Sequence, residues 1–182
     1  MKKPHCRALF LGCALFTLPV AASLAAATLP ATPATGITGS AAYQQMMKFA
    51  GEWTGPAQTP GGSPVSVIYR VTSAGKTVME TLFPGTDHEM VSMYHMDGPA
   101  LVMTHYCAAG NQPHLRLNES RSTPTEFVFD FAGGTNLDPA RDSHIHGLVL
   151  RIKSDSQLEA EWTSYKDGKK SEGLLYLITR KR

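Results

Sequence analysis

Apolar and polar residues alternate with a period of two along most of this chain of 182 residues. The alternation begins near Glu52, and Gly, Pro, Asp and Asn interrupt it at intervals of about ten residues. Such a pattern is typical of strands with one buried face, because successive side chains of a strand point to opposite sides. The sequence therefore predicts an all-β domain of ten strands, near residues 52–57, 65–72, 76–83, 88–97, 100–107, 113–118, 125–131, 143–153, 157–165 and 169–180.

The connections between these strands are short and have the chemistry of tight turns. Asp97-Gly98 and Asp167-Gly168 supply residues that tolerate the positive φ of a hairpin. About ten antiparallel strands joined in sequence make a meander, and closure of the meander removes its two exposed edges. We therefore expect a closed barrel rather than a sandwich.

One short helix is expected before the first strand, over residues 40–50. Ser40 can cap its first turn, and Tyr43 and Met46 lie on one apolar face. Gly51 follows the last helical residue, where a glycine commonly ends a helix.

The strand pattern also predicts which side chains face inward. On several strands the apolar residues share one parity and the charged residues share the other, with Ile68 as an apolar exception on 65–72. The interior is therefore lined by aromatic and β-branched side chains, which form either a solid core or the walls of an apolar cavity. The clearest inward sets are Val65, Val67, Tyr69 and Val71; Phe127, Phe129 and Phe131; and Leu158, Ala160 and Trp162.

Residues 1–27 have the pattern of an export signal. Lys2, Lys3 and Arg7 precede an apolar run, and small residues end the segment at Ala27. The run is broken by proline and lacks a stop-transfer flank, so no membrane span is expected in the mature chain. We expect an exported protein, periplasmic or secreted.

Removal of the signal changes the charge and the cysteine content. Residues 28–39 are predicted to be a flexible linker and residues 40–182 the barrel domain. The mature chain keeps 14 of the 17 basic residues against 15 acidic ones, a net charge of −1. Nucleic acid is therefore a poor partner despite the basic C-terminal tail, which is expected to be solvated.

Cys107 is the one cysteine left after the signal, so no disulfide can form within the mature chain.

Gly51-Glu52-Trp53 opens the first predicted strand directly after the helix. This arrangement resembles the Gly-x-Trp start of the calycin and lipocalin-like barrels, and the resemblance covers the mature chain as one helix followed by a meander. It implies a barrel that holds a small, mostly apolar molecule, in some members haem. The chain departs from typical lipocalins in lacking a disulfide pair. Residues 104–113, THYCAAGNQP, are similar to a segment of uncharacterised exported bacterial proteins.

Two histidines on one predicted strand are the most informative polar pair. His144 and His146 share the parity of Leu148 and Leu150, so both imidazoles are expected to point into the barrel. Residues two apart on a strand lie about 7 Å apart on one face, which lets the two rings converge on a metal ion or a polar ligand.

His105 and Cys107 repeat this spacing on another predicted strand. Together with His144 and His146 they could supply the nitrogen and sulfur ligands of a metal ion or haem. The alternative is that the histidines are hydrogen-bonded core residues and that Cys107 is a small buried hydrophobe.

Four further residues are candidate ligand contacts. Glu80 lies inside if Val78 and Leu82 face the core, and outside in the competing register; an inward Glu80 needs a partner to stay charged. Tyr94 and His95 lie on the neighbouring predicted strand, and Asn111 carries an amide in a turn.

The sequence leaves three hypotheses for function. The first is a lipocalin-like barrel that binds a small, largely apolar ligand, oriented by these polar residues and by Trp162. The second is a metal- or haem-binding enzyme or sensor, in which Glu80 is a general base. The third is a structural or interaction module with a filled barrel. Known hydrolase and redox motifs are absent from the sequence, so a binding protein is favoured over an enzyme, and nothing indicates an oligomeric state.

Overall fold

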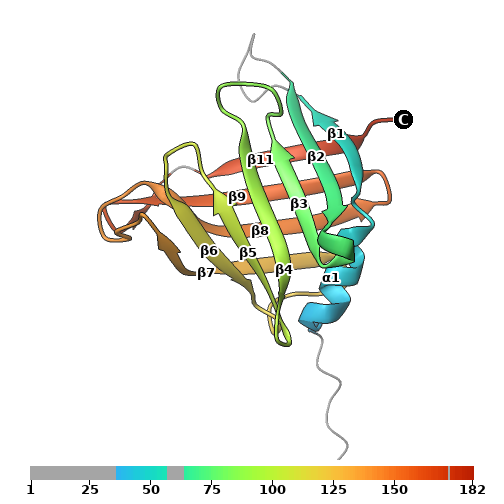
Figure 1. Cartoon of the computed structure of the whole chain (residues 1–182), viewed down its shortest axis with the longest axis horizontal. Coiled ribbons are helices and arrows are strands. Elements are labelled where there is room, and N and C mark those ends of the chain that lie inside the picture. The colour runs from blue at the N-terminus through green and yellow to red at the C-terminus, as the bar shows by residue number, and fades with distance from the viewer. Residues whose placement is uncertain (1–35, 57–63, 172) are drawn as a thin grey trace, which may run out of the picture. The chain divides into compact units, whose positions relative to one another are not determined.

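The computed structural model describes residues 36–56, 64–171 and 173–182. Within these ranges eleven strands form one antiparallel sheet, and pairing of β8 with β9 closes ten of them into a barrel (Figure 1). The predicted all-β fold, a closed meander after one short helix, is confirmed. The export signal predicted at residues 1–27, and the linker up to residue 35, lie outside the described residues. The elements are α1 (Gly39–Met47), β1 (Gly51–Gly55), β2 (Val65–Thr72), the short helix η1 (Ser73–Gly75), β3 (Thr77–Leu82), β4 (Met90–Asp97), β5 (Ala100–Tyr106), β6 (Gln112–Leu117), β7 (Glu126–Thr135), β8 (His144–Ser154), β9 (Gln157–Lys166), β10 (Lys169–Lys170) and β11 (Leu174–Arg180).

The last predicted strand, 169–180, is divided into β10 and β11. Both segments pair with β9, with Lys170 opposite Tyr165 and Leu174 opposite Trp162. The segment from β10 to β11 therefore advances by four residues while β9 advances by three, and the register slips by one residue. A regular strand cannot absorb such a slip, so the ladder is interrupted there.

Helix α1 covers one end of the barrel, beside the β2–β3 and β4–β5 turns (Figure 1). Its N-cap is Thr38, not the predicted Ser40, because Thr38 Oγ1 accepts a hydrogen bond from the Ala41 amide at 3.3 Å. Tyr43 and Met46 are buried on the inner face of the helix, and Tyr43 Oη donates to the Gly75 carbonyl at 3.0 Å. No helix in the described ranges is long and apolar enough to cross a membrane.

The interior between the two ends of the barrel is filled by side chains. The inner faces contribute one continuous apolar core, which includes Trp53, Tyr69, Tyr94, Phe127 and Phe129. Val71 was predicted to face inward but is 37% exposed. It lies at the end of the barrel, because β2 ends at the next residue, Thr72, and η1 begins directly after it. The barrel is therefore a packed core in its middle and not a wide channel.

The C-terminal segment is not simply a solvated tail. The Arg180 guanidinium lies 4.3 Å from the centre of the Trp53 ring. It also donates to the Ala50 carbonyl at 2.6 Å and to the Lys48 carbonyl at 2.8 Å. Arg180 thus attaches the last strand to the end of α1, where orphan helix carbonyls need donors.

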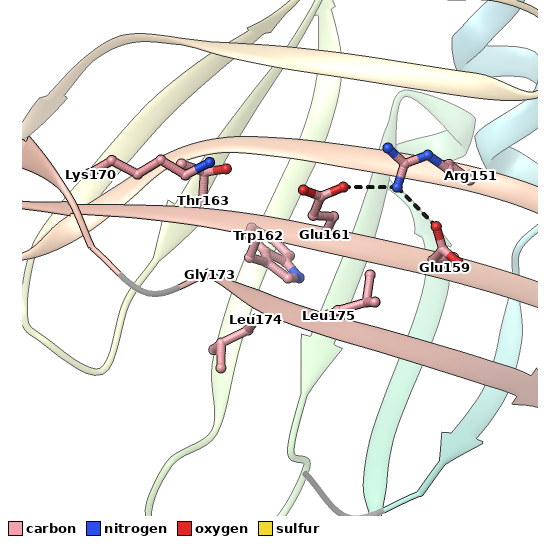
Figure 2. Close-up of a pocket in the computed structure, with 9 residues that line it drawn as sticks. All are labelled: Arg151, Glu159, Glu161, Trp162, Thr163, Lys170, Gly173, Leu174 and Leu175. Carbon is pink, nitrogen blue, oxygen red and sulfur yellow. Dashed lines mark hydrogen bonds and ion pairs between the residues drawn. The ribbon is translucent and has the colours of Figure 1, made fainter.

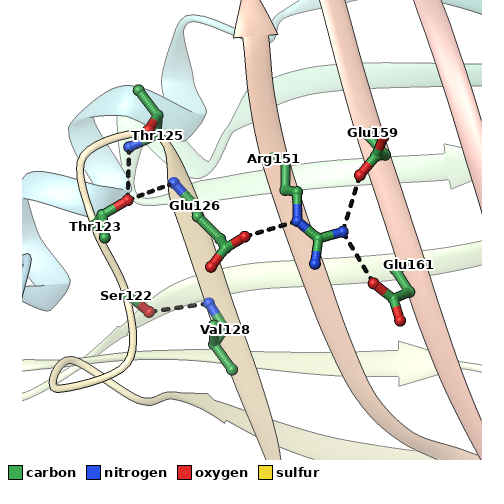
Figure 3. A network of polar contacts seen from close by, with 8 residues as sticks. All are labelled: Ser122, Thr123, Thr125, Glu126, Val128, Arg151, Glu159 and Glu161. Atoms are coloured by element: carbon green, nitrogen blue, oxygen red, sulfur yellow. Dashed lines mark hydrogen bonds and ion pairs between the residues drawn. The ribbon is translucent and has the colours of Figure 1, made fainter.

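The outer face of the barrel carries a charged network at the β7–β8–β9 wall (Figure 3). Arg151 donates to Glu126 Oε2 at 2.7 Å, and its Nη1 lies 2.9 Å from both Glu159 Oε1 and Glu161 Oε2. Glu126, Arg151 and Glu159 are opposite one another in the strand register, so they form a row across three strands. The three carboxylates raise the pKa of Arg151 further above its usual range.

Replacement of Arg151 by methionine is expected to lower the free energy of unfolding by about 1 kcal/mol, because three neighbouring carboxylates then repel one another without a cation. The loss should shrink in about 1 M salt, which screens partly exposed charges. Urea unfolding at low and high salt measures both effects. The exposed Arg116 provides the matched control, and equal losses for Arg151→Met and Arg116→Met would contradict the prediction.

Candidate functional site

A pocket opens at the end of the barrel opposite α1. Its walls are almost wholly apolar and enclose about 160 Å³. The lining comes from the ends of strands β3, β4, β5, β8, β9 and β11, which the closed meander brings together. We call it the mouth pocket, and its lining residues are Leu82, Met90, His105, Cys107, Ile145, Trp162, Leu174 and Tyr176.

Two nitrogen atoms at the mouth pocket lack a partner. Within the described part of the chain, neither His105 Nε2 nor Trp162 Nε1 has a hydrogen bond. The residues are only 2% and 3% exposed, and their ring centroids lie 5.2 Å apart. Buried polar atoms are nearly always hydrogen-bonded, since an unpaired one costs about 1–3 kcal/mol. The two nitrogens are therefore the unsatisfied polar groups among the residues that line this pocket.

A row of polar residues leads from the barrel core to this pocket. Tyr69 is opposite Glu80, Glu80 is opposite Ser92, and Ser92 is opposite His105 in the register of β2 to β5. Ser92 Oγ lies 3.0 Å from His105 Nδ1. All four side chains are buried, so the row is an internal polar network within an apolar core.

The structure settles the register of Glu80. Glu80 is 2% exposed and shares the inner face with Val78 and Leu82. Tyr69 Oη donates to Glu80 Oε1 at 2.6 Å, and Tyr94 Oη donates to Oε2 at 3.0 Å. Burial raises the pKa of Glu80, while the hydroxyls of Tyr69, Ser92 and Tyr94 oppose that rise. The hydroxyl donors are the partners that an inward Glu80 requires.

Burial has the opposite effect on His105. It lowers the pKa of the imidazole to about 4, because the charged form loses its hydration. His105 is therefore uncharged near neutral pH. The mouth pocket has no lysine, arginine or carboxylate in its lining and so presents no charge to a ligand.

His144 and His146 lie elsewhere, in an aromatic cluster with Phe131 and Tyr165. The His146 ring stacks between Phe131 and Tyr165, at centroid distances of 4.5 Å and 3.8 Å. His144 Nε2 lies 2.9 Å from His146 Nδ1, and burial together with His144 lowers the pKa of His146. The β8–β9 register shifts between Ile145 and Gly147, so strict alternation from Leu148 does not extend back to His144. Ile145, not either histidine, lines the mouth pocket.

The four residues considered as metal ligands are divided between two places. His105 and Cys107 line the mouth pocket, and His144 and His146 belong to the aromatic cluster. Among the described residues, no group of three or more His, Cys, Asp or Glu side chains is placed to hold a metal ion. The four residues therefore do not form one shared site.

The remaining candidates occupy different positions. Asn111 Nδ2 donates to the Ser143 carbonyl at 2.8 Å and joins the β5–β6 and β7–β8 loops. Tyr94 belongs to the buried network, whereas His95 is half-buried on the opposite face of β4. Neither Asn111 nor His95 lines the mouth pocket.

Sequence reasoning missed several residues of the pocket and its network. Four lining residues have no distinguishing chemistry, because they are ordinary apolar side chains whose place in the pocket depends on which strand ends meet. They are Leu82, Met90, Leu174 and Tyr176. Ser92 could have been found, because it shares the parity of Tyr94 on a predicted strand.

A second, charged groove lies against the outer wall (Figure 2). It encloses about 380 Å³ and includes Arg151, Glu159, Glu161 and Lys170. Trp162 and Leu174, which pair across β9 and β11, line both this groove and the mouth pocket.

The fold and the pocket together define a closed antiparallel barrel with one apolar recess at the end opposite its helix. Comparisons with protein-family models, with curated proteins and with solved structures find no match to this chain.

Proposed function

We propose that the protein is an exported, calycin-like barrel that binds a small, neutral, largely apolar molecule in the mouth pocket. The observation that carries the proposal is the pair of buried, unpartnered nitrogens, His105 Nε2 and Trp162 Nε1, in otherwise apolar walls. Concave apolar sites with a few polar groups are the usual form of small-molecule sites. Export is supported by the signal pattern of residues 1–27.

The size and charge of the pocket limit its ligand. A volume of about 160 Å³ accommodates one small ring or a short chain, since a cavity of about 150 Å³ is known to hold benzene. A charged ligand would find no countercharge from a lysine, an arginine, a carboxylate or an imidazolium, because the lining has none of the first three and the low pKa of His105 keeps its ring neutral. A completely filled barrel, the third sequence hypothesis, would have no such recess.

A ligand that occupies the pocket is expected to stabilise the protein by mass action. At ten times its Kd, toluene or phenol should raise the melting midpoint of the wild-type chain by about 3–6 °C. Leu174→Trp, which adds bulk at the pocket rim, should abolish that rise. Differential scanning calorimetry with and without each compound measures the change.

Leu177→Trp is the matched control, because Leu177 is exposed on the same strand and does not line the pocket. It should keep the full ligand-dependent rise. The proposal fails if neither compound changes the midpoint of the wild-type chain, or if both variants respond equally.

A further inference from the structure

The buried row that ends at His105 determines what its unpartnered nitrogen, Nε2, offers to a ligand. The Tyr69 and Tyr94 hydroxyls both donate to the Glu80 carboxylate, one to each oxygen. The 2.6 Å contact from Tyr69 is as short as charge-assisted O–H···O⁻ bonds usually are. Glu80 therefore acts as an acceptor on both of its oxygens.

Ser92 lies between Glu80 and His105 in the strand register, with its Oγ 3.0 Å from His105 Nδ1, and its hydroxyl is one of the groups that oppose the rise in the pKa of Glu80. A serine hydroxyl has one proton to give. When that proton is directed to the carboxylate, the Ser92 oxygen must accept a proton from His105 Nδ1. Because His105 is neutral, its Nε2 then carries no proton and is a hydrogen-bond acceptor.

The residues that line the mouth pocket thus include one buried acceptor and one buried donor that lack partners. His105 Nε2 needs a proton from the ligand, and Trp162 Nε1–H needs a lone pair. The two ring centroids lie 5.2 Å apart, so one small molecule can contact both rings. Among common neutral groups, a hydroxyl both donates and accepts at a single oxygen, whereas a ketone, aldehyde or ether only accepts.

On the basis of the proposed function, we infer that the ligand is a small alcohol or phenol whose hydroxyl bridges His105 Nε2 and Trp162 Nε1–H, with its ring or chain against the apolar walls. A carbonyl compound of the same shape leaves Nε2 unpaired, and a hydrocarbon leaves both nitrogens unpaired. Sites built to hydrogen-bond a hydroxyl discriminate strongly against analogues that lack it.

Two matched pairs of probes test the inference. Phenol and toluene have the same size and differ in the hydroxyl, and cyclohexanol and cyclohexanone differ in whether the oxygen can donate. Phenol is expected to bind at least about tenfold more tightly than toluene, and cyclohexanol about tenfold more tightly than cyclohexanone.

The ¹H–¹⁵N spectrum of the labelled protein provides the readout, because both tryptophans of the chain contribute an indole peak. The Trp162 peak should move with each bound probe. The Trp53 peak should stay in place, since Trp53 Nε1 already donates to the Phe49 carbonyl at 2.8 Å beneath α1. Dissociation constants follow from the titration of the Trp162 peak.

Long-range ¹H–¹⁵N spectra test the protonation of His105 separately. We expect a protonated Nδ1 and a bare Nε2. Ser92→Ala should reduce the preference for cyclohexanol over cyclohexanone to about twofold or less, because it releases Nδ1 from its acceptor. Thr104→Val, on the opposite face of β5, is the control and should retain the preference.

The outcomes separate the two proposals. If all four probes bind with similar dissociation constants, or if Nε2 carries the proton, the hydroxyl inference is wrong and the proposed function stands. If none of the four moves the Trp162 peak, the proposed function is wrong as well.

Discussion

Replacement of Trp53 by alanine is expected to lower the free energy of unfolding by about 3–5 kcal/mol. The indole is fully buried and contacts Phe49 and Tyr69 edge-on, at centroid distances of 6.5 Å and 6.4 Å. Its removal leaves a cavity between α1 and the barrel, and it deprives the Phe49 carbonyl of its donor. Guanidinium unfolding of the wild-type and variant chains measures the difference.

Two variants show whether this loss comes from burial. Trp53→Phe keeps part of the apolar contact but loses the indole N–H, so an intermediate loss of about 1–2 kcal/mol is expected. Val71→Ala removes a comparably apolar side chain from an exposed position and should change stability little. A Trp53→Ala loss no larger than that of Val71→Ala would contradict the packing described for α1.

Acid is expected to destabilise the protein through His105, by about 3 kcal/mol between pH 7 and pH 4. The pKa of His105 falls from its ordinary value of 6.5 to about 4 on burial, so the unfolded chain binds a proton that the folded chain does not. The stabilisation is complete above pH 6.5 and is lost as the pH falls toward 4. His105→Gln removes the titrating group and should remove this part of the pH dependence.

Glu80 also contributes to the pH dependence of stability, so the contribution of His105 has to be measured as a difference between two chains. Burial raises the pKa of Glu80, which favours the folded state as the pH falls and so opposes the effect of His105. The free energy of unfolding is therefore compared between the wild-type chain and His105→Gln at each pH from 7 to 4. His88→Gln, at an exposed position in the β3–β4 loop, is the control. Parallel pH profiles for wild type and His105→Gln would overturn the prediction.

The fold was predictable because its signals are local. Alternation and turn residues act over a few positions, so the strands, most of their inner faces and the closed meander followed from the sequence, whereas the inward predictions for Val71, His144 and His146 did not hold. The register slip before Leu174 was not predictable, since it depends on which residues of β9 lie opposite. A strand count that assumes regular pairing has no means of locating a one-residue irregularity.

The candidate site was predictable only in part. His105 and Trp162 were placed on inner faces by parity, and the structure puts both at the mouth pocket. His144 and His146 were counted inward by the same rule, but the irregularity between Ile145 and Gly147 places Ile145 at the pocket. Parity identifies which side chains of a regular strand face the barrel interior. A site at the strand ends also depends on β-bulges and on how far each strand extends toward that end of the barrel.

The pairing of β1 with β11 has a consequence for biogenesis. The first and the last strand of the wall are neighbours, and Trp53 lies opposite Arg180 in their register. A growing polypeptide consequently cannot close the barrel until β11 has left the ribosome, because contacts between such distant segments form late. This topology therefore delays closure of the barrel until β11 has been synthesised.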